Sequence, residues 1–339
     1  MTLETPLQRG DRVILALGGG AARGMAHIGV CHVLKEAGIE VAGVAGTSIG
    51  SAVGGILAAG KLEPYEEKMR HMTRKGVFSL LDPVIPRSGL FAGTRITNLM
   101  RSILGELLIE ECEIPYIAVA ATLKGGEEVW ISKGDLVDAM RASSSIPGVF
   151  TPIHHEGRWL IDGGVSSPVP FGAAASLGDL PVIAVDVNDQ TNGPPAGHME
   201  GEEREEPEHE LQPGKLDRIL AADQLHPALR EFAEGVRSTG NAASERIAME
   251  VKRMRQRIRT DPAEQPPRPP GMIESLTDVA INMMHQLASC QRELTPPEVM
   301  ITPRMEGVGI FDFHRTPELI AEGERATREA LGIAEVSAK

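Results

Sequence analysis

The first sixty residues of the chain repeat one pattern twice: a short apolar run, a glycine turn and a helical pattern. Residues 13–17 are apolar throughout and are followed by three glycines. Apolar side chains then recur at helical spacing over 25–37, and Gly38 stands where that helix should end. The second unit occupies 41–60. Wholly apolar strands that alternate with helices are typical of parallel sheets covered on both faces, so the sequence predicts an α/β fold.

The predicted architecture is a three-layer α/β/α domain with a mostly parallel sheet. The last helix should have Thr316 as its cap, Pro317 as its first residue and Gly332 just beyond its end. A helix capped by Asp135 should run to Arg141. Further strands are expected at 116–122, 129–132, 159–161 and 181–187, with a weaker one at 298–302.

The uncharged stretch 41–60 is long enough to suggest a transmembrane helix. Its six glycines, with Thr47, Ser48 and Ser51, favour a buried strand, a turn and a buried helix instead. The first twelve residues are charged and contain no apolar run, so we expect no signal peptide.

Composition excludes several classes of function. The net charge is −13 and aromatic residues make up 3% of the chain, which argues against nucleic acid as a partner. The three cysteines are scattered and form no CxxC pair, so neither a disulfide framework nor a metal site is expected. A reducing compartment follows, and the expected location is the cytoplasm, with peripheral membrane contact as an open alternative.

Residues 190–270 differ in kind from the rest. They are rich in proline and carry an acidic run from Glu200 to Glu210, which is typical of a solvated linker. Helical patterns lie between such segments. We therefore divide the chain into a core at 12–189, a helical insertion at 190–270 and a remainder of the core at 271–333.

Within the insertion, residues 243–259 combine an apolar stripe with a cluster of basic side chains. Such a helix can lie on an anionic membrane surface. It can equally pack against the helical pattern at 216–236, with its basic residues in solvent. Both interpretations stay open. The stripe is Ala243, Ile247, Val251, Met254 and Ile258, flanked by Arg246, Lys252, Arg253, Arg255, Arg257 and Arg259.

The segment from Gly46 to Gly50 fits the pattern G-x-S-x-G between a predicted strand and a predicted helix. A sharp strand-to-helix turn would expose the Ser48 hydroxyl at the carboxyl edge of the sheet. The flanking Gly46 and Gly50 suit a turn too tight for a Cβ atom. Ser48 is therefore a candidate nucleophile, and the amide of Ile49 lies at the start of the following helix.

A glycine-rich loop follows the first strand. It lacks the third glycine of a dinucleotide fingerprint, because Arg23 stands there, and it lacks the Gly-Lys-Ser/Thr of a P-loop. Unpaired N–H groups at a helix start can instead bind the oxygen of an acyl intermediate. Arg23 would brace this loop or add positive charge. The candidate oxyanion residues are Gly18, Gly19, Gly20, Ala21, Arg23, Gly24 and Ile49.

Asp162 follows the predicted strand at 159–161 and precedes Gly163 and Gly164. A serine hydroxyl is a weak nucleophile at neutral pH and needs a base. An aspartate beside Ser48 could accept its proton, provided that partial burial raises its pKa. Gly163 and Gly164 would let this loop approach the nucleophile closely.

These motifs, in this order, resemble the patatin-like phospholipases, over roughly 12–190 and again weakly over 272–332. The Ser-rich stretch Ala142–Phe150 resembles the family segment that precedes the acid. The resemblance implies a Ser48–Asp162 dyad, an oxyanion loop around Gly19 and Gly20, and hydrolysis of phospholipid or other acyl esters without metal or cofactor. It leaves the oligomeric state unknown.

Three alternatives stay open. A histidine could complete a triad in the order Ser, Asp, His, for which His198, His226, His285 and His314 are available; His154 and His155 favour a loop role. The same dyad could transfer an acyl group to an alcohol instead of water. A catalytically weak regulatory or interaction protein could also retain the fold.

Overall fold

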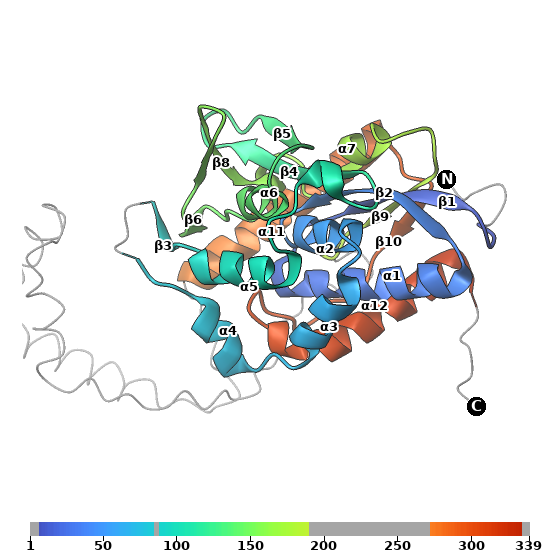
Figure 1. Ribbon diagram of the computed structural model, residues 1–339, viewed down its shortest axis with the longest axis horizontal. Coiled ribbons are helices and arrows are strands. Elements are labelled where there is room, and N and C mark those ends of the chain that lie inside the picture. The colour runs from blue at the N-terminus through green and yellow to red at the C-terminus, as the bar shows by residue number, and fades with distance from the viewer. Residues whose placement is uncertain (1–6, 85–87, 190–271, 334–339) are drawn as a thin grey trace, which may run out of the picture. The chain divides into compact units, whose positions relative to one another are not determined.

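The computed structural model of the protein describes residues 7–84, 88–189 and 272–333, with side chains omitted for 272–278. Its centre is an eight-stranded sheet (Figure 1). The sheet strands are β1 (Arg12–Leu17), β2 (Glu40–Thr47), β4 (Tyr116–Thr122), β5 (Glu128–Ile131), β7 (Ile153–His155), β8 (Arg158–Asp162), β9 (Val182–Val185) and β10 (Val299–Ile301). Strands β3 (Gly89–Phe91) and β6 (Gly148–Phe150) pair separately.

The sheet order is β10-β9-β1-β2-β4-β8-β7, and β5 pairs with β4 off this path. The five strands from β10 to β4 run parallel to one another, whereas β5 and β8 run antiparallel to β4. The prediction of a mostly parallel sheet is confirmed. The carboxyl ends of β1, β2, β9 and β10 consequently meet at one edge, which is where the candidate site lies.

Helices cover both faces of the sheet, as the three-layer prediction requires (Figure 1). The α-helices are α1 (Ala26–Ala37), α2 (Ile49–Ala58), α3 (Leu62–Arg70), α4 (Arg74–Leu80), α5 (Thr94–Leu104), α6 (Leu136–Ser143), α7 (Phe171–Ala175), α11 (Met272–Leu294) and α12 (Thr316–Leu331). Short 3₁₀ turns are η1 (Ala21–Met25), η2 (Ile109–Glu111), η3 (Gly163–Val165) and η5 (Phe313–Arg315).

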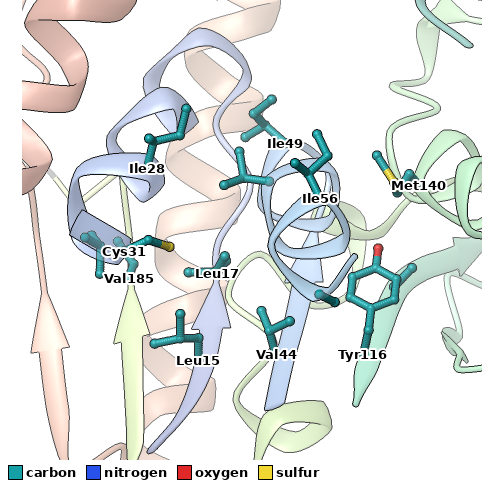
Figure 2. Close-up of a cluster of buried hydrophobic side chains, with 14 of the residues drawn as sticks. Leu15, Leu17, Ile28, Cys31, Val44, Ile49, Ile56, Tyr116, Met140 and Val185 are labelled. Atoms are coloured by element: carbon teal, nitrogen blue, oxygen red, sulfur yellow. The ribbon is translucent and has the colours of Figure 1, made fainter. Parts of the chain in front are cut away.

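Alternation along β1 divides the core between the two faces. Leu15 and Leu17 belong to the larger apolar cluster, which includes Ile28 of α1 and Ile56 of α2 (Figure 2). Ile14 and Ala16 belong to a second cluster formed with α7 and with Ala288 of α11. Since successive side chains of a strand point to opposite faces, an uninterrupted apolar strand needs this cover on both sides.

Helix α12 packs against α1 through two glycines. A Cβ atom on Gly29 would fall on the carbonyl oxygen of Ile320, and one on Gly323 would fall on that of Ala26. The helix backbones therefore lie in direct contact, which no larger residue would allow. This contact holds α12 beside the turn that carries the glycine loop.

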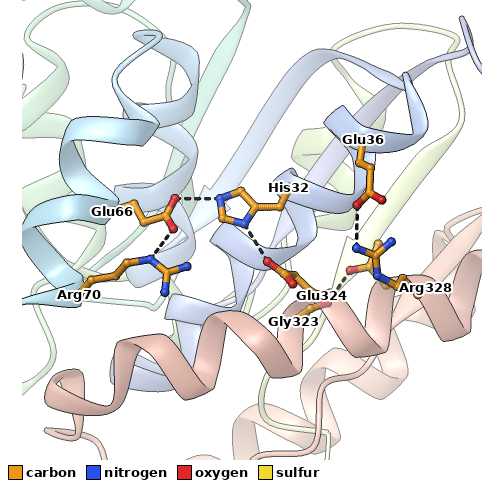
Figure 3. Close-up of polar contacts among 8 residues, drawn as sticks. His32, Glu36, Glu66, Arg70, Gly323, Glu324 and Arg328 are labelled. Carbon is orange, nitrogen blue, oxygen red and sulfur yellow. Dashed lines mark hydrogen bonds and ion pairs between the residues drawn. The ribbon is translucent and has the colours of Figure 1, made fainter. Parts of the chain in front are cut away.

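A polar network flanks the same helix pair (Figure 3). The His32 ring lies between two carboxylates, 2.8 Å from Glu66 of α3 and 2.9 Å from Glu324 of α12. Arg328 of α12 donates to Glu36 of α1. Partly exposed polar contacts such as these contribute little stability individually, so we infer that this network fixes the register of the helices and that their backbone contact holds them together.

Outside the predicted insertion, the predicted strands and helices are present with boundaries shifted by at most two residues, and three details differ. Residues 21–25 form a separate 3₁₀ turn before α1, where the glycine loop enters the helix. Thr316 is the first residue of α12 and not its cap; Arg315 precedes it, and the Thr316 hydroxyl donates to the Phe313 carbonyl. No element was predicted for 272–294, which forms α11.

The stretch 41–60 forms most of β2 and all of α2, as predicted. Among the residues that the structure describes, no helix is both long and apolar enough to cross a membrane. The predicted insertion at 190–270, with the basic stretch 243–259, lies outside the described residues.

Candidate active site

Ser48 lies alone between the end of β2 and the start of α2, with φ 56° and ψ −123°. A positive φ is strained for a residue with a side chain, and such strain clusters at functional sites. The turn is too tight for side chains on its two glycines. A Cβ atom on Gly46 would strike the carbonyl of Gly50, and one on Gly50 would strike that of Leu17. This is the strand-to-helix turn that the G-x-S-x-G pattern predicts.

Side chains from other segments hold the turn in this conformation. The Ser48 N–H donates to the Ser143 hydroxyl at 2.9 Å, and that hydroxyl donates to the Val119 carbonyl at 2.6 Å. The Thr47 hydroxyl donates to the Ser167 carbonyl at 2.8 Å. Ser143 thus has a positioning role that the Ser-rich stretch alone did not reveal.

Asp162 ends β8, and the structure brings it directly against Ser48. The Ser48 hydroxyl donates to Asp162 Oδ2 at 2.5 Å. The other carboxylate oxygen accepts the Gly164 N–H at 2.8 Å, which fixes the orientation of the group. Gly163 must be glycine because a Cβ atom there would fall on the Val119 carbonyl oxygen. The two residues come from loops 114 positions apart and form one buried pair.

The environment of Asp162 makes it a better base than an exposed aspartate. Burial disfavours the carboxylate and raises the pKa of Asp162 to about 6, although hydrogen bonds from Ser48 and Gly164 act in the opposite direction. A pKa near 6 leaves the group ionised at neutral pH and still able to accept a proton.

The glycine loop lies against this pair. A Cβ atom on Gly19 would be 3.2 Å from Ser48 Cβ, and one on Gly24 would strike the Ile49 side chain. The Gly18 and Gly19 N–H groups already donate, to the Val185 and Pro168 carbonyls, each at 2.9 Å.

Three amides of the predicted oxyanion set have no hydrogen-bonding partner in the described part of the chain: those of Gly20, Ala21 and Ile49. Ala21 has a φ of 50°, so strain occurs on both sides of the site. The amides of Gly20, Ala21 and Ile49 could therefore bind an anion. The amides of Gly18 and Gly19 are already used in hydrogen bonds to backbone carbonyls.

Arg23 braces the loop. Its Nε donates to the Val308 carbonyl at 3.1 Å and its Nη1 to the Asn188 side chain at 3.0 Å. Asn188 in turn donates to the Gly19 carbonyl at 2.7 Å. Of the two roles considered for Arg23, these contacts support bracing. Asn188 was not among the predicted site residues, because nothing in its local sequence marks it.

His27 is a second residue that the sequence did not single out. It is fully buried, and its Nε2 donates to the Gly18 carbonyl at 2.8 Å. Burial lowers the pKa of His27 to about 4, so the ring is neutral and supports the loop through its Nε2 proton.

The candidate triad histidines lie elsewhere or outside the described residues. Within the described ranges, Ser48 and Asp162 hydrogen-bond to no histidine. His314 accepts from Arg74, and His154 packs edge-on against Trp159. His198 and His226 fall in the undescribed segment. No cluster suited to a metal ion occurs among the described side chains.

Comparison with known proteins identifies a family for part of the chain. Residues 15–175 match the family model described as patatin-like phospholipase. This segment is a patatin-like phospholipase domain. Ser48 and Asp162 both lie within it, whereas Asn188, Val308 and α12 lie beyond its end. The family is one of lipid hydrolases, and the three-layer fold fits that assignment.

The patatin-like segment also has curated relatives. An uncharacterized NTE family protein of Mycobacterium tuberculosis is 43% identical over 183 residues, which cover 54% of this chain and 51% of the relative. Human patatin-like phospholipase domain-containing protein 6 is 33% identical, over 53% of this chain and 14% of its own. Drosophila neuropathy target esterase sws is 32% identical, over 53% and 13%. The chain thus spans about half of the length of the first relative and a much smaller share of the other two.

Among solved structures, VipD from Legionella pneumophila aligns with 96% of this chain and 67% of its own. The alignment has 13% sequence identity and a TM-score of 0.39, too distant to inform the site.

Proposed function

We propose that the protein is a serine lipid acyl hydrolase of the phospholipase A or esterase type, in which Ser48 and Asp162 form a catalytic dyad. The observation that carries the proposal is the 2.5 Å hydrogen bond from the strained Ser48 to a buried carboxylate of raised pKa. The patatin-like domain around the pair supports a lipid ester as substrate.

In the proposed reaction, Ser48 Oγ attacks the ester carbonyl carbon while its proton passes to Asp162 Oδ2. The carbonyl oxygen becomes an oxyanion and accepts hydrogen bonds from the amides of Gly20, Ala21 and Ile49. Collapse of this intermediate breaks the ester bond, and Asp162 returns the proton to the departing alcohol. Water, deprotonated by Asp162, then hydrolyses the acyl-enzyme and regenerates Ser48.

A short chromogenic acyl ester and an alkyl fluorophosphonate test the proposal. The wild-type protein should hydrolyse the ester and bind the phosphonate covalently at Ser48, with the site located by peptide mass spectrometry. Ser48→Ala should abolish both. Ser51→Ala is the matched control, a buried serine one turn along α2, and should retain most of the activity. Labelling of a different serine, or an active Ser48→Ala, would contradict the proposal.

Phospholipid substrates then distinguish the chemistry. Release of free fatty acid identifies a hydrolase, whereas acylation of added lysophospholipid in its place would identify transfer by the same dyad. Whether residues 243–259 contact the membrane remains a prediction. It is tested by sedimentation with anionic vesicles of the intact chain and of a chain in which these six basic residues are neutralised.

The pH dependence gives an independent check. Because the base must be ionised, kcat/KM should fall by tenfold per pH unit below about pH 6, following the raised pKa of Asp162. His285→Ala and His314→Ala should leave this limb in place. A limb near pH 4, where an unperturbed aspartate titrates, would mean that burial does not raise the pKa of the base.

A further inference from the structure

We propose that Asn188 is a positioning residue that sets the oxyanion hole by pinning one peptide plane, the one joining Gly19 to Gly20. The inference rests on the proposed function and names a residue outside the family segment. Asn188 is buried just beyond the end of β9, and its own N–H donates to Asp186 Oδ1 at 2.9 Å, which fixes its backbone.

The orientation of the Asn188 amide follows from its neighbours. Arg23 can only donate and a carbonyl can only accept, so Oδ1 faces Arg23 and Nδ2 faces the Gly19 oxygen, at 3.0 and 2.7 Å. Arg23 is itself held by the Val308 carbonyl. The chain of contacts runs from Val308 through Arg23 and Asn188 to Gly19.

The pinned carbonyl determines where the next amide points. The structure has no cis peptide bond among the described residues, and in a trans peptide the C=O and the following N–H point in opposite directions. With the Gly19 carbonyl drawn to Asn188, the Gly20 N–H points away from Asn188 and has no partner within the described residues. It is therefore available to a substrate oxygen.

The orientation of this peptide depends on a hydrogen bond from outside the loop more than that of its neighbours does. Residues on both sides of it are glycines, which impose little restraint on rotation. The preceding peptide, between Gly18 and Gly19, is held at both ends: His27 donates to its carbonyl, and its N–H donates to Pro168. The Gly19–Gly20 peptide is held at its carbonyl by Asn188, so Asn188 sets the direction of the donor.

Asn188→Asp tests the inference with almost no change in size. The carboxylate keeps its bond with Arg23 but presents an acceptor to the Gly19 oxygen, so the peptide should turn away. Loss of one oxyanion donor lowers kcat by about 10²–10³-fold, and we expect a fall in that range with KM for a short ester changed less than about threefold. A trifluoromethyl ketone, which forms an alkoxide on Ser48, should lose affinity by a similar factor.

The matched control is Gln291→Glu, the same amide-to-acid change on a side chain that donates to the Ser166 carbonyl at 2.7 Å. It should alter stability without the selective fall in kcat. If Asn188→Asp does not fold, Asn188→Ala removes the same donor and should show the same loss of ketone affinity. A folded Asn188 variant with wild-type kcat and ketone affinity overturns the inference. A wild-type protein without esterase activity or phosphonate labelling overturns the proposed function itself, and the inference with it.

Discussion

Replacing Asp162 with asparagine should lower kcat for ester hydrolysis by about 10³-fold or more, because the change removes the base and preserves the shape. The asparagine oxygen can still accept the Gly164 N–H, so the loop should keep its position. Steady-state kinetics on a short ester measure the effect. Activity within tenfold of the wild type would show that another group takes the Ser48 proton.

The same variant should be at least as stable as the wild type, and the difference should depend on pH. The folded-state pKa of Asp162 is about 6, above the value near 3.9 in an unfolded chain. The wild type therefore gains relative stability from this group at pH 4, where it is protonated, and loses it as pH rises through 6. At pH 8 the asparagine variant should be more stable, by about 2 kcal/mol.

Thermal melts at pH 4 and pH 8 separate these effects. The wild type and Asp162→Asn should converge at the lower pH and diverge at the higher one. If the variant is less stable than the wild type at pH 8, the hydrogen bonds donated to the wild-type carboxylate outweigh the cost of burying its charge.

Gly323→Ala should destabilise the fold by about 3 kcal/mol, although glycine in a helix normally costs stability. The added methyl would fall on the Ala26 carbonyl of α1, and a backbone cannot move aside as a flexible side chain can. Urea unfolding measures the effect.

Gly172→Ala provides the opposite sign. Gly172 is also helical, but it is exposed, and among the described residues a Cβ atom there would meet only Trp130, at an ordinary 3.7 Å. This variant should gain up to about 1 kcal/mol from reduced chain entropy. If both substitutions stabilised the protein, the close contact of α12 with α1 would be wrong.

The sequence was sufficient to predict the central strands, the glycine loop and the turn at Ser48. Each of these has a local cause: an apolar run, a glycine pair, or a helix start next to a strand end. The parallel strands β1 and β2 then bring the glycine loop and the Ser48 turn together at one edge. Asp162 reaches this edge on the antiparallel strand β8, and its pairing with Ser48 was expected only from the resemblance to the patatin-like phospholipases.

The hydrogen-bond partners around the site could not be predicted in this way. Whether the Gly19 amide is free or bound depends on Pro168, and the direction of the next amide depends on Asn188. Ser143 and His27 likewise act on backbone groups far away in sequence or hidden in a helix. Such contacts leave no periodic pattern in the sequence. Even the predicted cap of α12 was wrong by one residue, since Thr316 is the first residue of the helix.

The hydrogen bonds that hold the glycine loop determine at which stage of folding activity can appear. The loop precedes in the chain all four of the residues that hold it, which are Pro168, Val185, Asn188 and Val308. Contacts so distant in sequence form late in folding, because long loops must close before they can contribute. A nascent chain carrying Ser48 and Asp162 would still lack an ordered oxyanion site. Under the proposed function, hydrolytic activity would thus appear only after the segment that contains Val308 had been synthesised and had folded against the loop.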